Sequence, residues 1–90
     1  MQRFIDDDDA YLHWARSHRD GFVVNCLRSL SPRYLILHRA DCRTITGTPA
    51  RGETWTGEYI KVCSESRREL QGWAREETGG SLKACQICDP

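Results

Sequence analysis

Apolar side chains first recur with a helical period between residues 10 and 18. The recurring positions lie on one face of a helix: Tyr11, Trp14, Ala15 and His18. Four aspartates at residues 6–9 precede them, and carboxylates in a first turn favour a helix start through capping and the helix dipole. The same run could bind a cation, but a capped, solvated helix start is the simpler interpretation. Asp20 and Gly21 should end this helix.

Segments rich in β-branched and aromatic residues predict three strands, at residues 22–27, 34–38 and 59–63. Pro32 marks a turn between the first two, which should therefore form a hairpin. The third segment alternates, so Ile60 and Val62 should share one face of the sheet. The opposite face should carry Tyr59, Lys61 and Cys63.

A second helix is predicted after Ser66, which fits a capping box with Glu69; Ser64 is an alternative N-cap. Apolar residues follow at helical spacing on the side that should face the core: Leu70, Trp73 and Ala74. The two glycines after Thr78 should end the helix.

These segments together predict an α+β fold with a three-stranded antiparallel sheet, two helices and a C-terminal Cys-x2-Cys knuckle. Residues 1–90 should form a single domain. Its first helix falls within residues 1–20, and the sheet, a loop, the second helix and the knuckle fall within residues 21–90.

The predicted loop covers residues 44–57, which include three glycines and one proline. A loop this long in so small a domain is typically either functional or disordered. Trp55, beside Arg51, could be exposed and stack on a base. It could equally fold back as a lid over the core.

The spacing of cysteine and histidine predicts a metal site. Cys85 and Cys88 form a Cys-x2-Cys knuckle, a pattern that also occurs in redox sites. His38 and Cys42 offer a nitrogen and a third sulfur from a strand end and the turn after it. Three thiolates and one imidazole make a closed tetrahedral set, which structural zinc prefers. The expected cofactor is zinc.

Chain length gives a second reason to expect a metal. A 90-residue domain buries only about two-thirds of its unfolded surface, so its core is marginal without further stabilisation. The binding energy of a structural zinc, of order 10 kcal/mol, becomes folding energy when the site exists only in the folded state.

Charge and cysteine content restrict the partners. Thirteen basic and thirteen acidic residues cancel, although residues 21–63 are mildly basic, which permits a phosphate-facing surface. No signal peptide and no apolar run of membrane-spanning length is visible, so no membrane partner is expected. Five cysteines, an odd number, suit a soluble, cytoplasmic protein with reduced thiols, in which Cys26 is a small buried core residue.

From Tyr34 onwards the motifs resemble a known module, the Ada-like metal-binding domain. The resemblance rests on a strand ending in His38-x3-Cys42, a further strand, a helix and Cys85-x2-Cys88-x-Pro90. Such domains begin methylphosphotriester DNA repair proteins, where four cysteines at the same paired spacings hold zinc, and similar modules follow some nuclease domains. The resemblance implies a zinc site and a DNA partner.

The sequence departs from that family at three positions. His38 stands where the repair proteins have the cysteine that accepts the methyl group, and an imidazole cannot serve as that thiolate. The repair reaction is therefore not expected here. The knuckle holds Gln86 and Ile87 where the family often has Lys or Arg, and Ala84 replaces a proline. Both changes weaken the inference to phosphate binding.

The leading functional hypothesis is a non-enzymatic zinc module that contacts nucleic acid, with DNA as the expected partner. Candidate contacts are Arg39, Arg43, Arg51, Trp55, Lys61, Arg67 and Arg68. Any of these basic residues could instead pair with neighbouring carboxylates. The alternative hypothesis is a zinc-stabilised protein–protein interaction module. Four protein ligands would leave the metal no open position, so neither catalysis nor a small-molecule substrate is expected.

Overall fold

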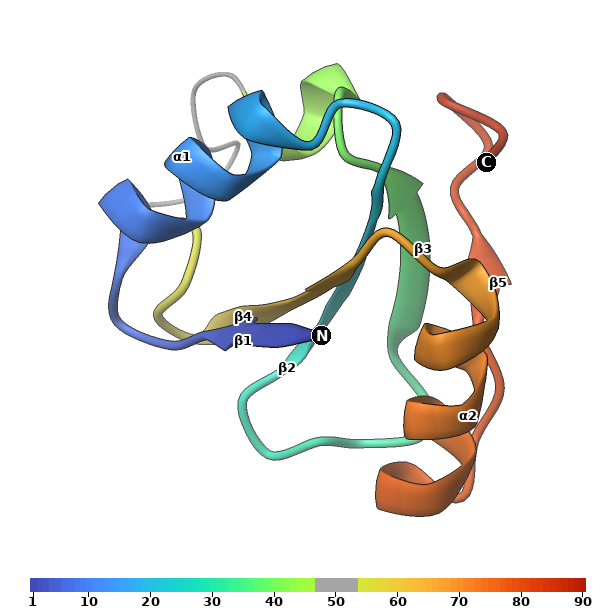
Figure 1. Ribbon diagram of the computed structural model, residues 1–90. Helices are drawn as coiled ribbons and strands as arrows, with labels where there is room; N and C mark the ends of the chain where they lie inside the picture. Colours follow the sequence, from blue (N-terminus) through green and yellow to red (C-terminus); the bar gives the residue numbers. More distant parts are fainter. Residues whose placement is uncertain (47–53) are drawn as a thin grey trace.

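The computed structural model describes residues 1–46 and 54–90, which form a five-stranded sheet with a helix on each side (Figure 1). The elements in chain order are β1 (Gln2–Phe4), α1 (Asp8–Ser17), β2 (Phe22–Leu27), β3 (Leu35–Arg39), the 3-10 helix η1 (Arg43–Ile45), β4 (Tyr59–Ser64), α2 (Arg67–Thr78) and β5 (Lys83–Ala84).

The predicted α+β class with two helices is confirmed, and so is the β2–β3 hairpin, in which Val24 lies opposite Leu37. The predicted sheet was too small. Its antiparallel core β4-β2-β3 is extended at both edges, giving the order β1-β4-β2-β3-β5. β1 pairs antiparallel with β4, whereas β5 pairs parallel with β3, so the sheet is mixed. These added strands have three and two residues, too few to show an alternating pattern.

The two faces of the sheet carry separate apolar cores. On one face, α1 packs Tyr11 and Trp14 with Val23 and Cys63 of the sheet. On the other face, α2 packs its predicted residues Leu70, Trp73 and Ala74 with residues that include Val24, Cys26, Ile60 and Val62. The predicted alternation along β4 and the burial of Cys26 are therefore confirmed.

Both helices begin with side-chain caps. Asp7 accepts a hydrogen bond from the Ala10 amide at 3.2 Å, and Ser66 accepts one from the Glu69 amide at 3.1 Å. Only half of the predicted capping box forms, because the Glu69 carboxylate accepts from the Ser64 hydroxyl at 2.6 Å. Gly79 ends α2 with φ at +74°, a conformation that glycine adopts without a steric penalty.

Trp55 folds back over the core and is 8% exposed, which confirms the lid interpretation against the stacking one. Two charged side chains hold its backbone. The Asp8 carboxylate accepts from the Trp55 and Thr56 amides, both at 2.9 Å, and from the Thr56 hydroxyl at 2.6 Å. The Lys61 ammonium donates to the Trp55 carbonyl at 2.6 Å. Segment 54–56 is therefore fixed to α1 and β4.

Lys61 is only 2% exposed, and its Nζ also donates to Asn25 Oδ1 at 2.9 Å. Burial lowers the pKa of Lys61 to about 8, whereas in the unfolded chain it should be near the ordinary value of about 10.4. Between these values the folded protein releases a proton that the unfolded chain retains. The contribution of Lys61 to the free energy of unfolding must therefore rise with pH across this window.

We expect wild type to gain about 3 kcal/mol of stability relative to Lys61→Met between pH 7.5 and 10.5, since one pKa unit corresponds to about 1.4 kcal/mol. Urea unfolding of both proteins across this range, with reductant, measures the difference. Burial raises the pKa of the thiols of Cys26 and Cys63 to about 11 and about 12, so both thiols stay largely protonated in the folded proteins over this range, and their titration in the unfolded chain is common to both. A difference that stays constant with pH would contradict the assignment of Lys61 as a buried charge.

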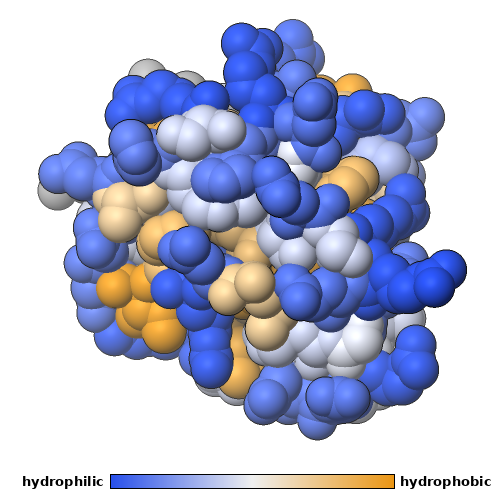
Figure 2. Space-filling view, viewed as in Figure 1, coloured by the Kyte–Doolittle hydropathy of each residue, from blue (hydrophilic) through white to orange (hydrophobic). Residues whose placement is uncertain are grey.

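Hydrophilic side chains dominate the face drawn in Figure 2, and apolar colour appears there as separate patches. The large apolar residues that are exposed in the described chain are Met1, Ile5, Tyr34 and Ile87. Among residues 1–46 and 54–90, no helix is both long and apolar enough to cross a membrane.

Candidate metal centre

The four predicted ligands come together at one end of β3. One ligand atom each of His38, Cys42, Cys85 and Cys88 forms a group in which all atoms lie within 4.8 Å of one another. His38, Cys42 and Cys85 are 6%, 3% and 8% exposed, and Cys88 is half-buried. A cluster of buried sulfur and nitrogen donors could hold a metal ion.

The first pair of ligands is placed by the end of β3. His38 pairs with Val23 of β2, which fixes its backbone within the sheet. The chain then turns sharply, with the Cys42 amide donating to the Arg39 carbonyl at 3.0 Å. We call residues 38–42 the metal turn. This turn of five residues brings the side chains of His38 and Cys42 into the same cluster.

The second pair is placed by β5, one of the two strands that the sequence did not predict. Ala84 lies beside Leu37, and the Cys85 amide donates to the Leu37 carbonyl at 2.9 Å. This parallel pairing brings Cys85 alongside the end of β3. The knuckle, residues 85–88, then closes with the Asp89 amide donating to the Cys85 carbonyl at 3.0 Å.

Arg39 joins the metal turn to the knuckle through three hydrogen bonds. Its backbone amide donates to Cys88 Sγ at 3.3 Å, its Nε to the Cys88 carbonyl at 3.0 Å and its Nη2 to the Asp89 carbonyl at 3.1 Å. Burial and the neighbouring thiols raise the pKa of Cys88 to about 11, and the Arg39 amide opposes this shift by favouring the thiolate, which is the form that binds metal. Arg39 therefore stabilises the site as well as carrying a charge at the surface.

The electrostatics of His38 also suit a metal ligand. Its Nδ1 is buried and has no hydrogen-bond partner among the described residues, an arrangement that costs free energy unless something else satisfies it. Burial, assisted by the nearby positive charge of Lys61, lowers the pKa of His38 to about 4. The imidazole is therefore neutral near pH 7 and keeps a lone pair for a metal ion.

The knuckle provides amides for its first sulfur. The Ile87 amide donates to Cys85 Sγ at 3.4 Å. Burial alone would raise the pKa of the Cys85 thiol, but the backbone amides of Cys88 and Ile87 outweigh it and hold this pKa below its usual value. Three sulfurs this close repel one another as thiolates, and a bound cation removes that repulsion.

The donor set fits zinc. Zinc bonds of about 2.0–2.3 Å in a tetrahedron separate the donor atoms by about 3.3–3.8 Å. The observed upper limit of 4.8 Å requires only a small approach of the side chains. A metal bound here by all four residues would have a complete coordination shell and would act structurally.

Two of the predicted nucleic-acid contacts are not at the surface. Trp55 and Lys61 are 8% and 2% exposed, so their inclusion is corrected: neither side chain is available to a nucleic acid in this conformation. Both residues are buried because of the polar groups that hold them, Asp8 for Trp55 and Asn25 for Lys61. Arg51 lies outside the described residues. The exposed candidates are Arg39, Arg43, Arg67 and Arg68.

Two of these exposed arginines also donate hydrogen bonds to the C-terminal segment, residues 88–90. Arg39 contacts Cys88 and Asp89 as described above, and Arg67 Nη1 donates to the Pro90 carbonyl at 2.8 Å. Arg43 directly follows the ligand Cys42 and begins η1. Three arginines are therefore close to the metal centre in space or in sequence, while Arg68 follows on α2.

No protein-family model matches the chain, and comparisons with curated proteins and with solved structures gave no match either. The resemblance to the Ada-like domain therefore stays a prediction.

Proposed function

We propose that this protein is a non-enzymatic module whose fold is held by a structural zinc ion bound to His38, Cys42, Cys85 and Cys88. The observation that carries the proposal is the convergence of these four donors within 4.8 Å, from segments almost 50 residues apart. The buried imidazole of His38, whose lowered pKa keeps it neutral near pH 7, also supports it. Four protein ligands leave no coordination position for a substrate or an activated water, which argues against catalysis.

The proposed location is the cytoplasm, because the five cysteines are free thiols. Thiols persist in a reducing compartment, where clustered cysteines bind metal in preference to forming disulfides.

The proposed partner is nucleic acid, most simply the phosphate backbone of DNA. Exposed arginines on the metal turn, on η1 and at the start of α2 support this: Arg39, Arg43, Arg67 and Arg68. Those on α2 lie in its first turn, where backbone amides also attract anions. The zinc-bound main chain would keep the first two in place.

The test is a titration of fluorescently labelled duplex and single-stranded oligonucleotides at several salt concentrations. Replacing Arg43 and Arg68 with alanine should weaken binding about equally for all sequences. It should also reduce the slope of log K against log salt by roughly two units, one for each lost phosphate contact. Arg39 and Arg67 are left in place because they contact the C-terminal segment.

The matched control is Arg75→Ala combined with Arg33→Ala, which removes the same charge from other exposed positions. This control should leave the slope unchanged. Absence of binding to either oligonucleotide at low salt would refute the nucleic-acid partner while leaving the zinc proposal intact, because zinc content is measured separately.

A further inference from the structure

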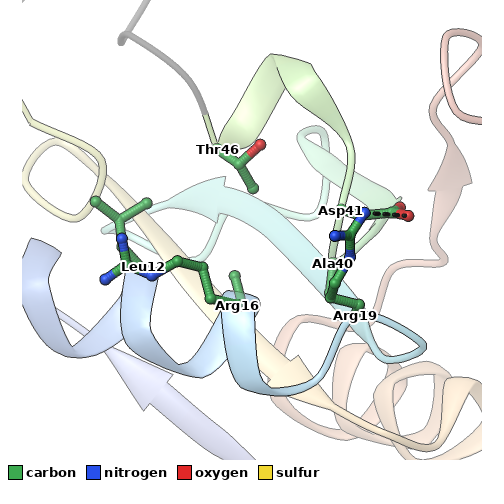
Figure 3. A pocket seen from close by; sticks show the side chains of 7 residues that line it. Leu12, Arg16, Arg19, Ala40, Asp41 and Thr46 are labelled. Atoms are coloured by element: carbon green, nitrogen blue, oxygen red, sulfur yellow. Dashed lines mark ion pairs between the residues drawn. The ribbon is translucent and has the colours of Figure 1, made fainter.

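A groove of about 510 Å³ lies between α1 and the metal turn, and none of the four proposed metal ligands lines it. One wall comes from α1 and the residues after it, and the other from the metal turn and the end of η1. Its lining residues are Leu12, Ala15, Arg16, Arg19, Ala40, Asp41 and Thr46 (Figure 3).

The floor of the groove is aliphatic. Ala15 and Ala40 are 2% and 0% exposed, so they close the bottom of the groove and present almost no surface of their own. The half-buried Leu12 provides the apolar surface that a ligand can contact. A floor of this kind accepts an aliphatic side chain, which would be desolvated there.

The rim of the groove is basic. Arg16 and Arg19 are both exposed, and Arg19 reaches across the groove towards Asp41 (Figure 3). Arg19 Nη2 and Asp41 Oδ2 are 4.0 Å apart, and their side chains are 74% and 44% exposed. An ion pair this long and this exposed is weak, so the Arg19 guanidinium can bind another carboxylate. The Asp41 carboxylate and the Thr46 hydroxyl can accept hydrogen bonds from a backbone amide.

We propose that this groove binds a peptide segment in which acidic residues flank an aliphatic side chain. The aliphatic side chain would occupy the floor, and its acidic neighbours would pair with Arg16 and Arg19. A volume of about 510 Å³ suits one such side chain with its adjoining backbone, because ligand pockets typically measure about 300–1,000 Å³.

The lining favours a peptide over a nucleic acid. None of the described residues that line the groove is aromatic, so the floor offers no ring for base stacking. Asp41 on the rim repels a continuous phosphate backbone, which carries a charge at every nucleotide, whereas a peptide can place an amide rather than one of its carboxylates opposite Asp41. The proposal goes beyond the nucleic-acid function and uses none of the arginines assigned to it.

The test is a selection of random twelve-residue peptides displayed on phage, using the immobilised, zinc-loaded 90-residue chain. Selected peptides are then synthesised with a fluorescent label, and their affinity is measured by anisotropy. We expect enrichment of sequences with Asp or Glu on both sides of Leu, Ile or Val. Reversing the rim charge with Arg16→Glu and Arg19→Glu should weaken their binding at least about tenfold.

The matched control reverses two arginines of α2 instead, Arg68→Glu and Arg75→Glu, and should keep the affinity within about twofold. Leu12→Gln, at a half-buried position, tests the floor and should weaken binding without changing its salt dependence. Circular dichroism and zinc content verify that each variant is folded.

Three results would overturn the proposal: no enrichment of any motif, a loss of affinity that is equal for both charge reversals, or displacement of the bound peptide by an oligonucleotide whose own binding needs Arg16 and Arg19. The last would assign the groove to nucleic acid. Each is distinguishable from failure of the proposed function, since that is tested with Arg43 and Arg68.

Discussion

Replacing Cys85 with alanine is expected to abolish zinc binding and to unfold the domain at neutral pH. Cys85 is one of four donors within 4.8 Å, and its segment pairs with the sheet through the two-residue strand β5 and is held further by the hydrogen bonds of Arg39. Structural zinc contributes roughly 10 kcal/mol or more in small domains, while the whole stability of a domain is about 5–15 kcal/mol. Loss of the metal should therefore remove most of the stability.

The measurements are zinc per chain by elemental analysis and thermal unfolding by circular dichroism, with and without a chelator. Wild type should contain about one zinc per chain and should lose its cooperative transition with a chelator. Cys26→Ala is the matched control, because Cys26 is also a buried cysteine but belongs to the α2 core. It should keep the metal and lose only about 1–2 kcal/mol. A metal-free protein with full thermal stability would refute the structural-zinc proposal.

His38→Cys separates ligand identity from geometry in the same experiment. The spacing already suits a four-sulfur site, so this variant should retain zinc. His38→Ala leaves three ligands and should bind zinc more weakly. If both variants bound zinc like wild type, His38 would not be a ligand.

The cluster of four donors could be predicted from the sequence because its chemistry is specific. Few combinations of Cys and His spacing produce four soft donors, and the geometry then follows from two short turns. The periodic helices and the strands of the hairpin were predictable for a similar reason, since each has enough residues to show its period. The face that Val62 shares with Ile60 followed directly from alternation.

Other features depend on contacts that no local pattern encodes. β5 exists because Lys83 and Ala84 pair with β3, and two residues carry no periodic signal. The part that Arg39 plays in holding the knuckle could not be predicted, because its hydrogen-bond acceptors lie about 50 positions later in the chain. The groove likewise forms where α1 meets the metal turn, and only the tertiary structure brings these together.

The burial of Trp55 and Lys61 has the same kind of cause. The sequence allowed Trp55 to be either exposed or folded over the core. Its position is fixed by the Asp8 carboxylate, 47 residues earlier, which accepts a hydrogen bond from the Trp55 amide. Asp8 had been interpreted only as part of a capped, solvated helix start. It does lie in the first turn of α1, but it also satisfies two backbone amides of another segment.

Asp8→Ala is therefore expected to destabilise the domain by about 2–4 kcal/mol, because it leaves the amides of Trp55 and Thr56 without their acceptor at about 1–3 kcal/mol each. The lower part of the range is expected, since Asp8 is only half-buried and water can reach part of the site. Urea unfolding at pH 7 measures the loss. Asp9→Ala is the matched control: Asp9 is also an aspartate of the first turn, but it is exposed, so it reports the helix-dipole contribution of about 0.3–1 kcal/mol alone.

The pH dependence of the stability difference between wild type and Asp8→Ala tests whether the ionised Asp8 carboxylate is the stabilising group. Burial opposes ionisation of Asp8, but the hydrogen bonds from Thr56 and Trp55 outweigh it and hold its pKa below the ordinary value of about 3.9. A carboxylate with a lowered folded-state pKa contributes stability that is fully present above its unfolded pKa and is lost as the pH falls through its folded pKa.

The difference in unfolding free energy between wild type and Asp8→Ala should thus be constant from pH 5 to pH 7 and should shrink below about pH 4. Asp6 and Glu69 titrate in both proteins and cancel. Two results would contradict this assignment: a stability difference that persists undiminished at pH 2.5, or an effect of Asp9→Ala as large as that of Asp8→Ala. Either would show that Asp8 stabilises the start of α1 rather than its bonds to segment 54–56.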